Sequence, residues 1–364
     1  MTSPTEMIPV KYKKREYAAN RDLWHELLDL AAPSTDLGRG RTTSSLIPNL
    51  GKSTLEGYLT KRYDRKYCIF TNCATDALDL AVSVYPSKKW YVPSYTWSSP
   101  VSAIAKSGAE ICFLDVDYET RTVDYTNYDP DYPIIVPHID GQTANRPPSQ
   151  SCFVIEDSAQ SALAEDNNFG DLFILSLGST KRMGLLGQGG CILTDNKDLA
   201  ERLQRLTVFG LDSSRTLIEP GYKTFTDPYN ALCSYHLFKI YDTGEPLARV
   251  NKIIEHFNDC LGIYMPPGLE RYSIKVKDRE LYRTKLEDQN IESRVWIKNH
   301  ASRWDCFAKF DVSPLPISDL LIDHTIDIPM NQFLTDDEVE HMGHVLKDLR
   351  NFVAKDIEDC KDSS

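Results

Sequence analysis

The sequence has no excess of basic residues and no long hydrophobic run. Its 364 residues include 41 Lys and Arg against 53 Asp and Glu, which gives a net charge of −12 at pH 7. A negatively charged chain repels the phosphates of nucleic acids, so we expect no nucleic-acid partner. No apolar stretch approaches the ~20 residues that a membrane-spanning helix needs, so we expect no membrane partner either.

The sequence also lacks paired cysteines and clustered histidines. Its nine cysteines form no Cys-x-x-Cys pair and mostly lie in apolar, strand-like runs, as reduced thiols in a protein core do. The eight histidines form no His-x-x-x-His or Cys/His cluster, so no metal site is predicted. Met1–Pro9 contains no basic stretch followed by an apolar core, so no secretory signal is predicted. We expect a cytoplasmic protein.

Two nucleotide-binding motifs are missing. Asn49-Leu-Gly-Lys-Ser-Thr54 resembles the end of a phosphate-binding P-loop, but position 46 holds Leu where that loop needs glycine. No Gly-x-Gly-x-x-Gly follows a predicted strand, which argues against a nicotinamide dinucleotide fold.

Short β-branched and aromatic runs alternate with helical periodicity between residues 66 and 194. This alternation predicts an α/β fold with a mostly parallel seven-stranded sheet covered on both faces. The predicted strands are Lys66–Phe70, Trp90–Val92, Ile111–Leu114, Ile134–Pro137, Cys152–Ile155, Phe173–Ser176 and Cys191–Thr194. The predicted helices are Thr75–Val84, Pro100–Lys106 and a segment within Asn196–Phe209.

The length favours about two domains. The helical segment Ser234–Cys260 is interrupted near Gly244–Pro246, and we place the domain change there. We expect a large domain over residues 36–245 and a smaller C-terminal α/β domain over 246–355. Residues 1–35 are predicted to form an arm and one amphipathic helix, and residues 356–364 a frayed polar tail.

Three elements are predicted in the smaller domain before its last helix. They are a strand at Tyr272–Val276, a helix at Asp278–Asp288 and a strand at Ile291–Ile297. The last helix opens with Thr335-x-x-Glu338, the spacing of a capping box.

Four segments of the large domain carry polar or aromatic groups just after predicted strands. Ala74 and Thr75 begin a helix whose free N–H groups could hold a phosphate, although a plain helix cap is the commoner interpretation. Trp97 and Asp157 each end such a strand, where core packing and helix capping respectively are the ordinary explanations. Lys181 precedes the closely spaced glycines 184, 187, 189 and 190.

The order of these segments is more specific than any one of them. A phosphate cup, an aromatic plate, an Asp-x-x-Gln and a downstream lysine match the chemical needs of pyridoxal 5'-phosphate (PLP). On these segments, together with His138-Ile-Asp-Gly-Gln142 and Ile328-Pro-Met-Asn-Gln, the chain resembles the DegT/DnrJ/StrS family of PLP-dependent nucleotide-sugar aminotransferases. The resemblance covers about Thr54 to Lys347 and implies the fold type I architecture of aspartate aminotransferase.

The resemblance implies a role for each matching residue. Lys181 forms the Schiff base with PLP and then moves a proton between the substrate and cofactor carbons. Asp157 pairs with the pyridine nitrogen, Gln160 lies near the phenolic oxygen, and Trp97 stacks on the ring. The implied phosphate ligands are the amides of Ala74 and Thr75 and the hydroxyls of Thr75 and Ser176.

The resemblance also implies the partners of the reaction. The amino donor is glutamate or glutamine, and the acceptor is a 3-keto or 4-keto deoxysugar linked to a nucleotide. A homodimer with shared active sites is expected, in which Lys223 or Tyr222 of segment Gly221–Asp227 reaches the neighbouring subunit's phosphate.

Two positions depart from the family pattern. Gln188 stands where relatives commonly have Glu or Asp, a change that is tolerable. The family's Pro-Leu-His stretch is missing after Arg294-Val-Trp, so the sugar-side contacts are not carried over and the sugar stays unassigned. A sugar-deoxygenating variant of the family carries histidine at the position of Lys181, so the lysine argues against that chemistry. A non-catalytic PLP-binding regulator, and an aminotransferase acting on a cyclitol or other carbocyclic ketone, stay open as alternatives.

Overall fold

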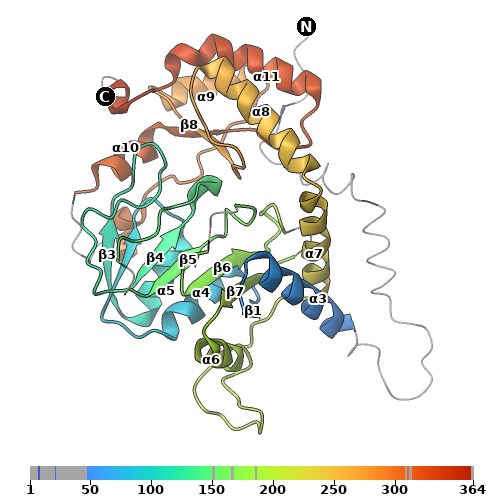
Figure 1. Cartoon of the computed structure of the whole chain (residues 1–364). Coiled ribbons are helices and arrows are strands. Elements are labelled where there is room, and N and C mark those ends of the chain that lie inside the picture. Colours follow the sequence, from blue (N-terminus) through green and yellow to red (C-terminus); the bar gives the residue numbers. More distant parts are fainter. Residues whose placement is uncertain are drawn as a thin grey trace.

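A computed structural model describes residues 7–8, 21, 47–149, 152–164, 168–184, 187–307, 310 and 314–361. Its larger sheet has seven strands in the order β1-β7-β6-β5-β4-β2-β3 (Figure 1). Within this sheet β7 alone runs antiparallel to its neighbours. The prediction of a mostly parallel seven-stranded sheet is therefore confirmed.

Each predicted strand of this sheet is present, with ends shifted by two residues at most. The strands are β1 (Tyr67–Thr71), β2 (Lys89–Pro93), β3 (Glu110–Leu114), β4 (Ile134–Pro137), β5 (Val154–Asp157), β6 (Leu172–Ser176) and β7 (Gly190–Thr194). Four of them, β4 to β7, are buried at every residue, which is why their sequences are mostly apolar. The exception is β5, which ends in Glu156 and Asp157.

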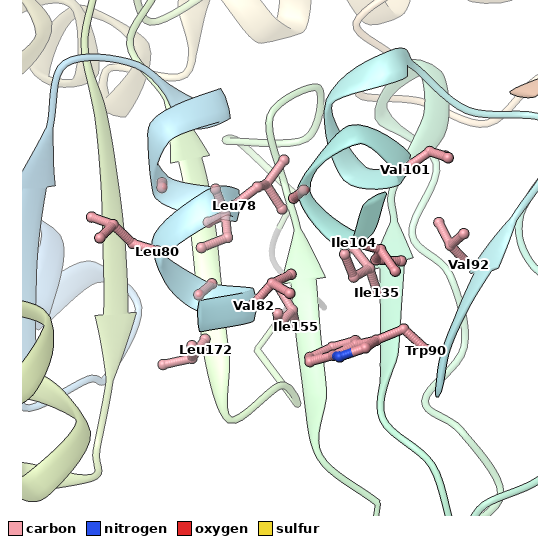
Figure 2. Close-up of a cluster of buried hydrophobic side chains, with 14 of the residues drawn as sticks. Leu78, Leu80, Val82, Trp90, Val92, Val101, Ile104, Ile135, Ile155 and Leu172 are labelled. Atoms are coloured by element: carbon pink, nitrogen blue, oxygen red, sulfur yellow. The ribbon is translucent and has the colours of Figure 1, made fainter. Parts of the chain in front are cut away.

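One face of the large sheet is covered by α4 (Ala74–Ser83), α5 (Ser98–Ser107) and α6 (Lys197–Thr207). Figure 2 shows Val82 of α4 beside Ile155 and Ile104 of α5 beside Ile135 of the sheet. The helix ends follow local chemistry: Asn196 caps α6 through its side chain, and α5 ends at a glycine with φ 79°.

The other face of the sheet is covered by α3 (Ile47–Arg62) and α7 (Pro228–Asp242). Successive residues of β6 point to opposite faces, so Phe173 and Leu175 pack on this side while Leu172 and Ile174 pack on the side of α4. Residues 49–54, which resemble the end of a P-loop, lie within helix α3 and form no phosphate-binding loop.

A second, two-stranded antiparallel sheet pairs β8 (Tyr272–Lys275) with β9 (Thr325–Ile328). The helices α8 (Glu245–Leu261), α9 (Arg279–Glu287) and α11 (Asp336–Leu349) share a core with it, above the large sheet in Figure 1. The capping box of α11 is confirmed, because the Thr335 hydroxyl accepts the Glu338 N–H and the Glu338 carboxylate accepts the Thr335 N–H. Shorter helices are η2 (Ile139–Gly141), η3 (Ala301–Arg303), η4 (Asp305–Phe307), α10 (Pro316–His324), η5 (Arg350–Phe352) and α12 (Ile357–Lys361).

The predicted strand Ile291–Ile297 is wrong. Only isolated bridges form there, from Ile291 to Ile8 and from Arg294 to Asp327, because β8 pairs with β9 instead. The apolar residues of this segment pack as single side chains instead: Ile291 lies in the core around α8, and Trp296 stacks on Trp97.

The two ends of the chain are described only in part. Of the predicted arm and helix over residues 1–35, all but residues 7, 8 and 21 lie outside the described part, and Ile8 is buried in the core around α8. Instead of a frayed tail, residues 357–361 form α12, whose Cys360 is buried beside the Tyr118 hydroxyl.

All nine cysteines are free thiols, as predicted. Among the described residues, no helix has the length and apolarity required to cross a bilayer, and no group of three or more His, Cys, Asp or Glu side chains could hold a metal ion.

Candidate active site

The carboxyl ends of the parallel strands meet at one edge of the large sheet. Asp157 ends β5 and Ser176 ends β6. Gly190, the first residue of antiparallel β7, is paired with Ser176 on one side and with Thr71 on the other. Ligands of open α/β sheets bind at this edge, so the sequence-predicted groups are brought to the place where a ligand site is expected.

The N-terminus of α4 lies directly against this edge. A Cβ on Gly190 would come within 2.5 Å of the Ala74 nitrogen, so only glycine permits the close approach. The Thr75 hydroxyl lies 2.8 Å from that of Ser99 in the first turn of α5, which brings two helix N-termini together. Cys73 caps α4 by accepting the Asp76 N–H at its thiol, a role that the sequence analysis did not assign.

Asp157 is a buried carboxylate with one hydrogen bond from the described residues. Its Oδ1 accepts the N–H of Ala159 at 3.1 Å. Burial raises the pKa of Asp157, and the Ala159 amide and the Lys181 ammonium oppose that rise. A further cationic partner would favour the ionised carboxylate.

Gln160 is buried three residues after Asp157. Its Oε1 accepts the N–H of Asp140 at 3.0 Å, so the amide group Nε2 is left as the donor. Asp140 has φ 57°, a left-handed conformation that turns the chain after β4. This orientation suits a Gln160 that donates to an oxygen of a bound ligand.

Lys181 lies in a tight turn after β6. Its N–H donates to the Gly178 carbonyl at 2.8 Å, and its carbonyl accepts the Gly184 N–H at 3.2 Å. A Cβ on Gly184 would come within 1.9 Å of the Gly178 oxygen, so the turn requires glycine there. At Gly184, therefore, the closely spaced glycines allow this turn to pack against its own backbone.

Glu156, next to Asp157, is fully buried and fully paired. Its Oε2 accepts the N–H groups of Phe169 and Gly170 at 2.9 and 2.8 Å. Because His138 Nδ1 accepts the Ala144 N–H, the ring proton is on Nε2, which donates to Glu156 Oε1 at 2.9 Å. Three donors therefore fix this carboxylate and, through it, the end of β5.

Trp97 is half exposed and stacks on Trp296, with ring centroids 5.0 Å apart and an interplanar angle of 25°. The Arg271 guanidinium lies 3.5 Å from the centre of the Trp296 ring, so Trp97 has to use the opposite face of that ring. Trp296 comes from the segment that the sequence analysis assigned to a strand, and it was missed as a neighbour of the site.

A buried hydrogen-bond network holds these aromatic segments together. Ser94, three residues before Trp97, lies 2.7 Å from His300 Nδ1, and His300 Nε2 lies 2.6 Å from a carboxylate oxygen of Asp319. The Ala301 N–H donates to the Ser94 carbonyl at 2.9 Å. The Ser-His-Asp pattern does not form a hydrolytic site, because the Ser94 side chain is fully buried.

The segment Gly221–Asp227 packs beside α4 of its own chain. The Thr224 hydroxyl accepts the Asn72 N–H at 2.7 Å and donates to Asp76 at 2.6 Å. Tyr222 and Lys223 are exposed beside this anchor. None of the described contacts joins Tyr222 or Lys223 to the groups at the sheet edge of the same subunit.

The groups at the sheet edge fit PLP by their donor and acceptor chemistry. Hydroxyl and amide donors at Thr75, Ser176 and the α4 N-terminus suit a phosphate, and the acidic Asp76 of that turn has both its carboxylate oxygens bound, by Thr224 and Cys73. At the opposite end, Asp157 suits a protonated ring nitrogen.

Comparison with known proteins gives a family and a fold. The model of the DegT/DnrJ/EryC1/StrS aminotransferase family matches residues 51–347. A dTDP-3-amino-3,6-dideoxy-alpha-D-galactopyranose transaminase from Aneurinibacillus thermoaerophilus is 25% identical over 305 residues, covering 76% of this chain and 84% of the relative. A UDP-N-acetyl-3-dehydro-alpha-D-glucosamine 3-aminotransferase from Acidithiobacillus ferrooxidans is 24% identical, covering 75% and 81%.

Among solved structures, DesV of S. venezuelae superposes with a TM-score of 0.83, covering 96% of this chain and 100% of DesV at 18% identity. At that identity the superposition shows a shared fold. The fold type I architecture implied by the resemblance is thereby confirmed.

The paired Glu156 generates a stability prediction. In Glu156→Gln, the new NH2 group faces at least one N–H donor whichever way the amide is turned, because all three partners of Glu156 donate hydrogen. We expect the free energy of unfolding to fall by about 1–3 kcal/mol in denaturant titration. The control Glu110→Gln changes an exposed carboxylate 3.7 Å from Lys89 and should stay within about 0.5 kcal/mol of the parent. Equal losses for the two variants would show that the buried donors do not fix Glu156.

Proposed function

The chain belongs to the DegT/DnrJ/EryC1/StrS aminotransferase family, and from this premise we propose that it uses PLP to transfer an amino group from glutamate or glutamine to a nucleotide-linked keto sugar. The observation that carries the proposal is the placement of the buried Asp157 at the end of β5 and of Lys181 in the tight turn after β6, both at the carboxyl edge of the sheet.

Bound PLP would supply an aldehyde carbon that exchanges amines and a ring that withdraws electrons from the reacting carbon. Lys181 would move the proton between Cα of the donor and C4′ of the cofactor. Asp157 would keep the pyridine nitrogen protonated, and Gln160 would donate its Nε2 hydrogen to the phenolic oxygen. Trp97 would lie against the ring.

The phosphate would be held where two helices begin. The amides of Ala74 and Thr75 and the hydroxyls of Thr75 and Ser176 are the proposed ligands in the same subunit. The helix N-terminus favours the negative charge, and the closeness of Gly190 to α4 supports a compact cup there. In a chain of net charge −12, such local donors are needed to hold an anion.

The acceptor proposal draws on the relatives. One is named for a dTDP-linked dideoxy amino sugar and another for a UDP-linked 3-dehydro amino sugar, so a nucleotide-linked 3-keto or 4-keto sugar is the class that they support. The nine free thiols support a reducing compartment, and we propose the cytoplasm. We also propose the domain division near residue 245, because α7 packs in a core with the large sheet and α8 in a core with the small one.

The function is tested with purified protein, PLP and a panel of nucleotide-linked 3-keto and 4-keto sugars. Amine gain by mass with glutamate or glutamine as donor is the expected result. Lys181→Ala should retain non-covalent PLP and lose about 10²- to 10⁴-fold in kcat, because the proton carrier is gone. Borohydride should trap PLP on Lys181. Labelling of another lysine, or normal turnover by the variant, would contradict the assignment.

Asp157 generates a second kinetic prediction. Asp157→Asn removes the charge that holds the ring proton, so kcat should fall by ~10²-fold while donor KM changes little. The matched control Asp171→Asn alters a carboxylate that binds the Val154 N–H at the opposite end of β5, and it should leave kcat nearly unchanged. A raised KM with unchanged kcat for Asp157→Asn would reassign Asp157 to capping or substrate contact.

We propose a homodimer that shares its active sites, with a second copy covering an exposed apolar surface between residues 208 and 229. Isolated exposed apolar residues are ordinary, whereas a run of them marks an interface. The surface consists of Val208, Phe209, Leu217, Ile218, Tyr222, Phe225 and Tyr229, each 46% exposed or more. Lys223 lies within it and is the proposed ligand for the partner subunit's phosphate, with Tyr222 as the weaker candidate.

Subunit mixing tests this arrangement. Lys223→Ala should lower PLP affinity, whereas the control Lys252→Ala, on the exposed face of α8, should not. Mixing inactive Lys181→Ala and Lys223→Ala subunits should restore activity in heterodimers, because one site receives both defects and the other neither. An active monomer in sedimentation, or verified heterodimers without activity, would overturn the shared site and leave the roles of Lys181 and Asp157 standing.

A further inference from the structure

A short strap, Leu269–Arg271, precedes β8 and lies between the two sheets. On one side it meets Arg182, the residue after Lys181. Arg182 Nη2 donates to the Leu269 carbonyl at 2.6 Å, and its Nε lies 3.3 Å from the Glu270 carboxylate. The Arg182 side chain is only 10% exposed, so these contacts are shielded from water.

On its other side the strap meets the turn after β4. The Glu270 N–H donates to the Asp140 carbonyl at 2.9 Å. A Cβ on Gly141 would come within 2.5 Å of the Glu270 nitrogen, so the two backbones are in direct contact. Asp140 in turn donates its N–H to Gln160. The strap thus touches both the turn of Lys181 and the turn that orients Gln160.

We propose that Arg182 and the strap are positioning elements that hold the Lys181 turn and the Asp140 turn at a fixed separation, and that this sets the rate of amine transfer. The role in rate rests on the proposed function, because it matters only if Lys181 and Gln160 act on a common ligand. Arg182 and Glu270 act through the two turns that they join, so they are positioning residues.

Arginine suits this position better than lysine would. Its planar guanidinium reaches a carbonyl and a carboxylate at once, and it also lies 5.9 Å from the centre of the Tyr241 ring on α7. A lysine ammonium is a point charge on a flexible stem and cannot span both acceptors with fixed geometry. Arg182→Lys should therefore rescue only part of what Arg182→Ala loses.

The test combines amide hydrogen exchange of the PLP-free protein with steady-state kinetics of the PLP-loaded protein. In Arg182→Ala, amides of residues 178–184 should exchange about tenfold faster without PLP, because two charge-assisted contacts are gone. With PLP, kcat should fall about tenfold to 10²-fold at nearly constant donor KM. Arg182→Lys should fall between this variant and the parent.

Two further variants separate positioning from general destabilisation. Arg283→Ala removes an exposed arginine paired within α9 and should change neither readout. Gly141→Ala pushes the strap from its far side and should speed exchange in residues 178–184 as well, although it lies on another turn.

The outcomes are distinguishable. If the amides of residues 178–184 exchange no faster in Arg182→Ala than in Arg283→Ala, the strap does not hold the Lys181 turn and the proposal is wrong. Faster exchange with an unchanged kcat would also contradict the proposal. If the parent protein transfers no amine while exchange rises as expected, the strap contacts stand and the proposed function fails.

Discussion

Asp140 is the residue on which the junction of the two sheets depends. Its buried carboxylate lies 3.3 Å from Arg121 and 3.8 Å from Arg271, its N–H binds Gln160, and its carbonyl accepts from the strap before β8. A buried charge is costly unless it is paired, so separating the sheets would leave ions unpaired in a dry environment. Burial, with the nearby Asp140 charge, raises the pKa of Asp327 on β9 to about 6, which shows how crowded with charge this junction is.

The parts that the sequence predicted correctly depend on local pattern. Apolar runs of about five residues predict buried strands because a strand covered on both faces has no polar side. The seven strands of the large sheet were therefore found within two residues. The capping box at Thr335 was found because it too is a local pattern. Asp157 and Lys181 each follow such a strand, and the carboxyl ends of parallel strands lie at one edge of a sheet, so the sequence also predicts that these two residues share that edge.

The missed parts depend on contacts between segments far apart in the chain. Trp97 and Trp296 stack across about two hundred residues, and Arg182 meets Glu270 across nearly ninety. The residues of Ile291–Ile297 carry no signal that β9, and not this segment, pairs with β8. The stacking of Trp296 on Trp97 follows from that pairing and could not be predicted locally. A tertiary contact overrode strand propensity there, as is common for short β-branched runs.

The proposed site therefore combines two parts that are held by different contacts. The proposed chemistry rests on groups fixed by the large sheet, where burial and backbone hydrogen bonds leave Asp157 and the Lys181 turn little freedom. The segment after Arg294 brings Trp296 against Trp97 and the buried His300 against Ser94. The relatives, each about 25% identical, are named for different nucleotide-linked sugars, so the family match carries the reaction type and not one particular sugar.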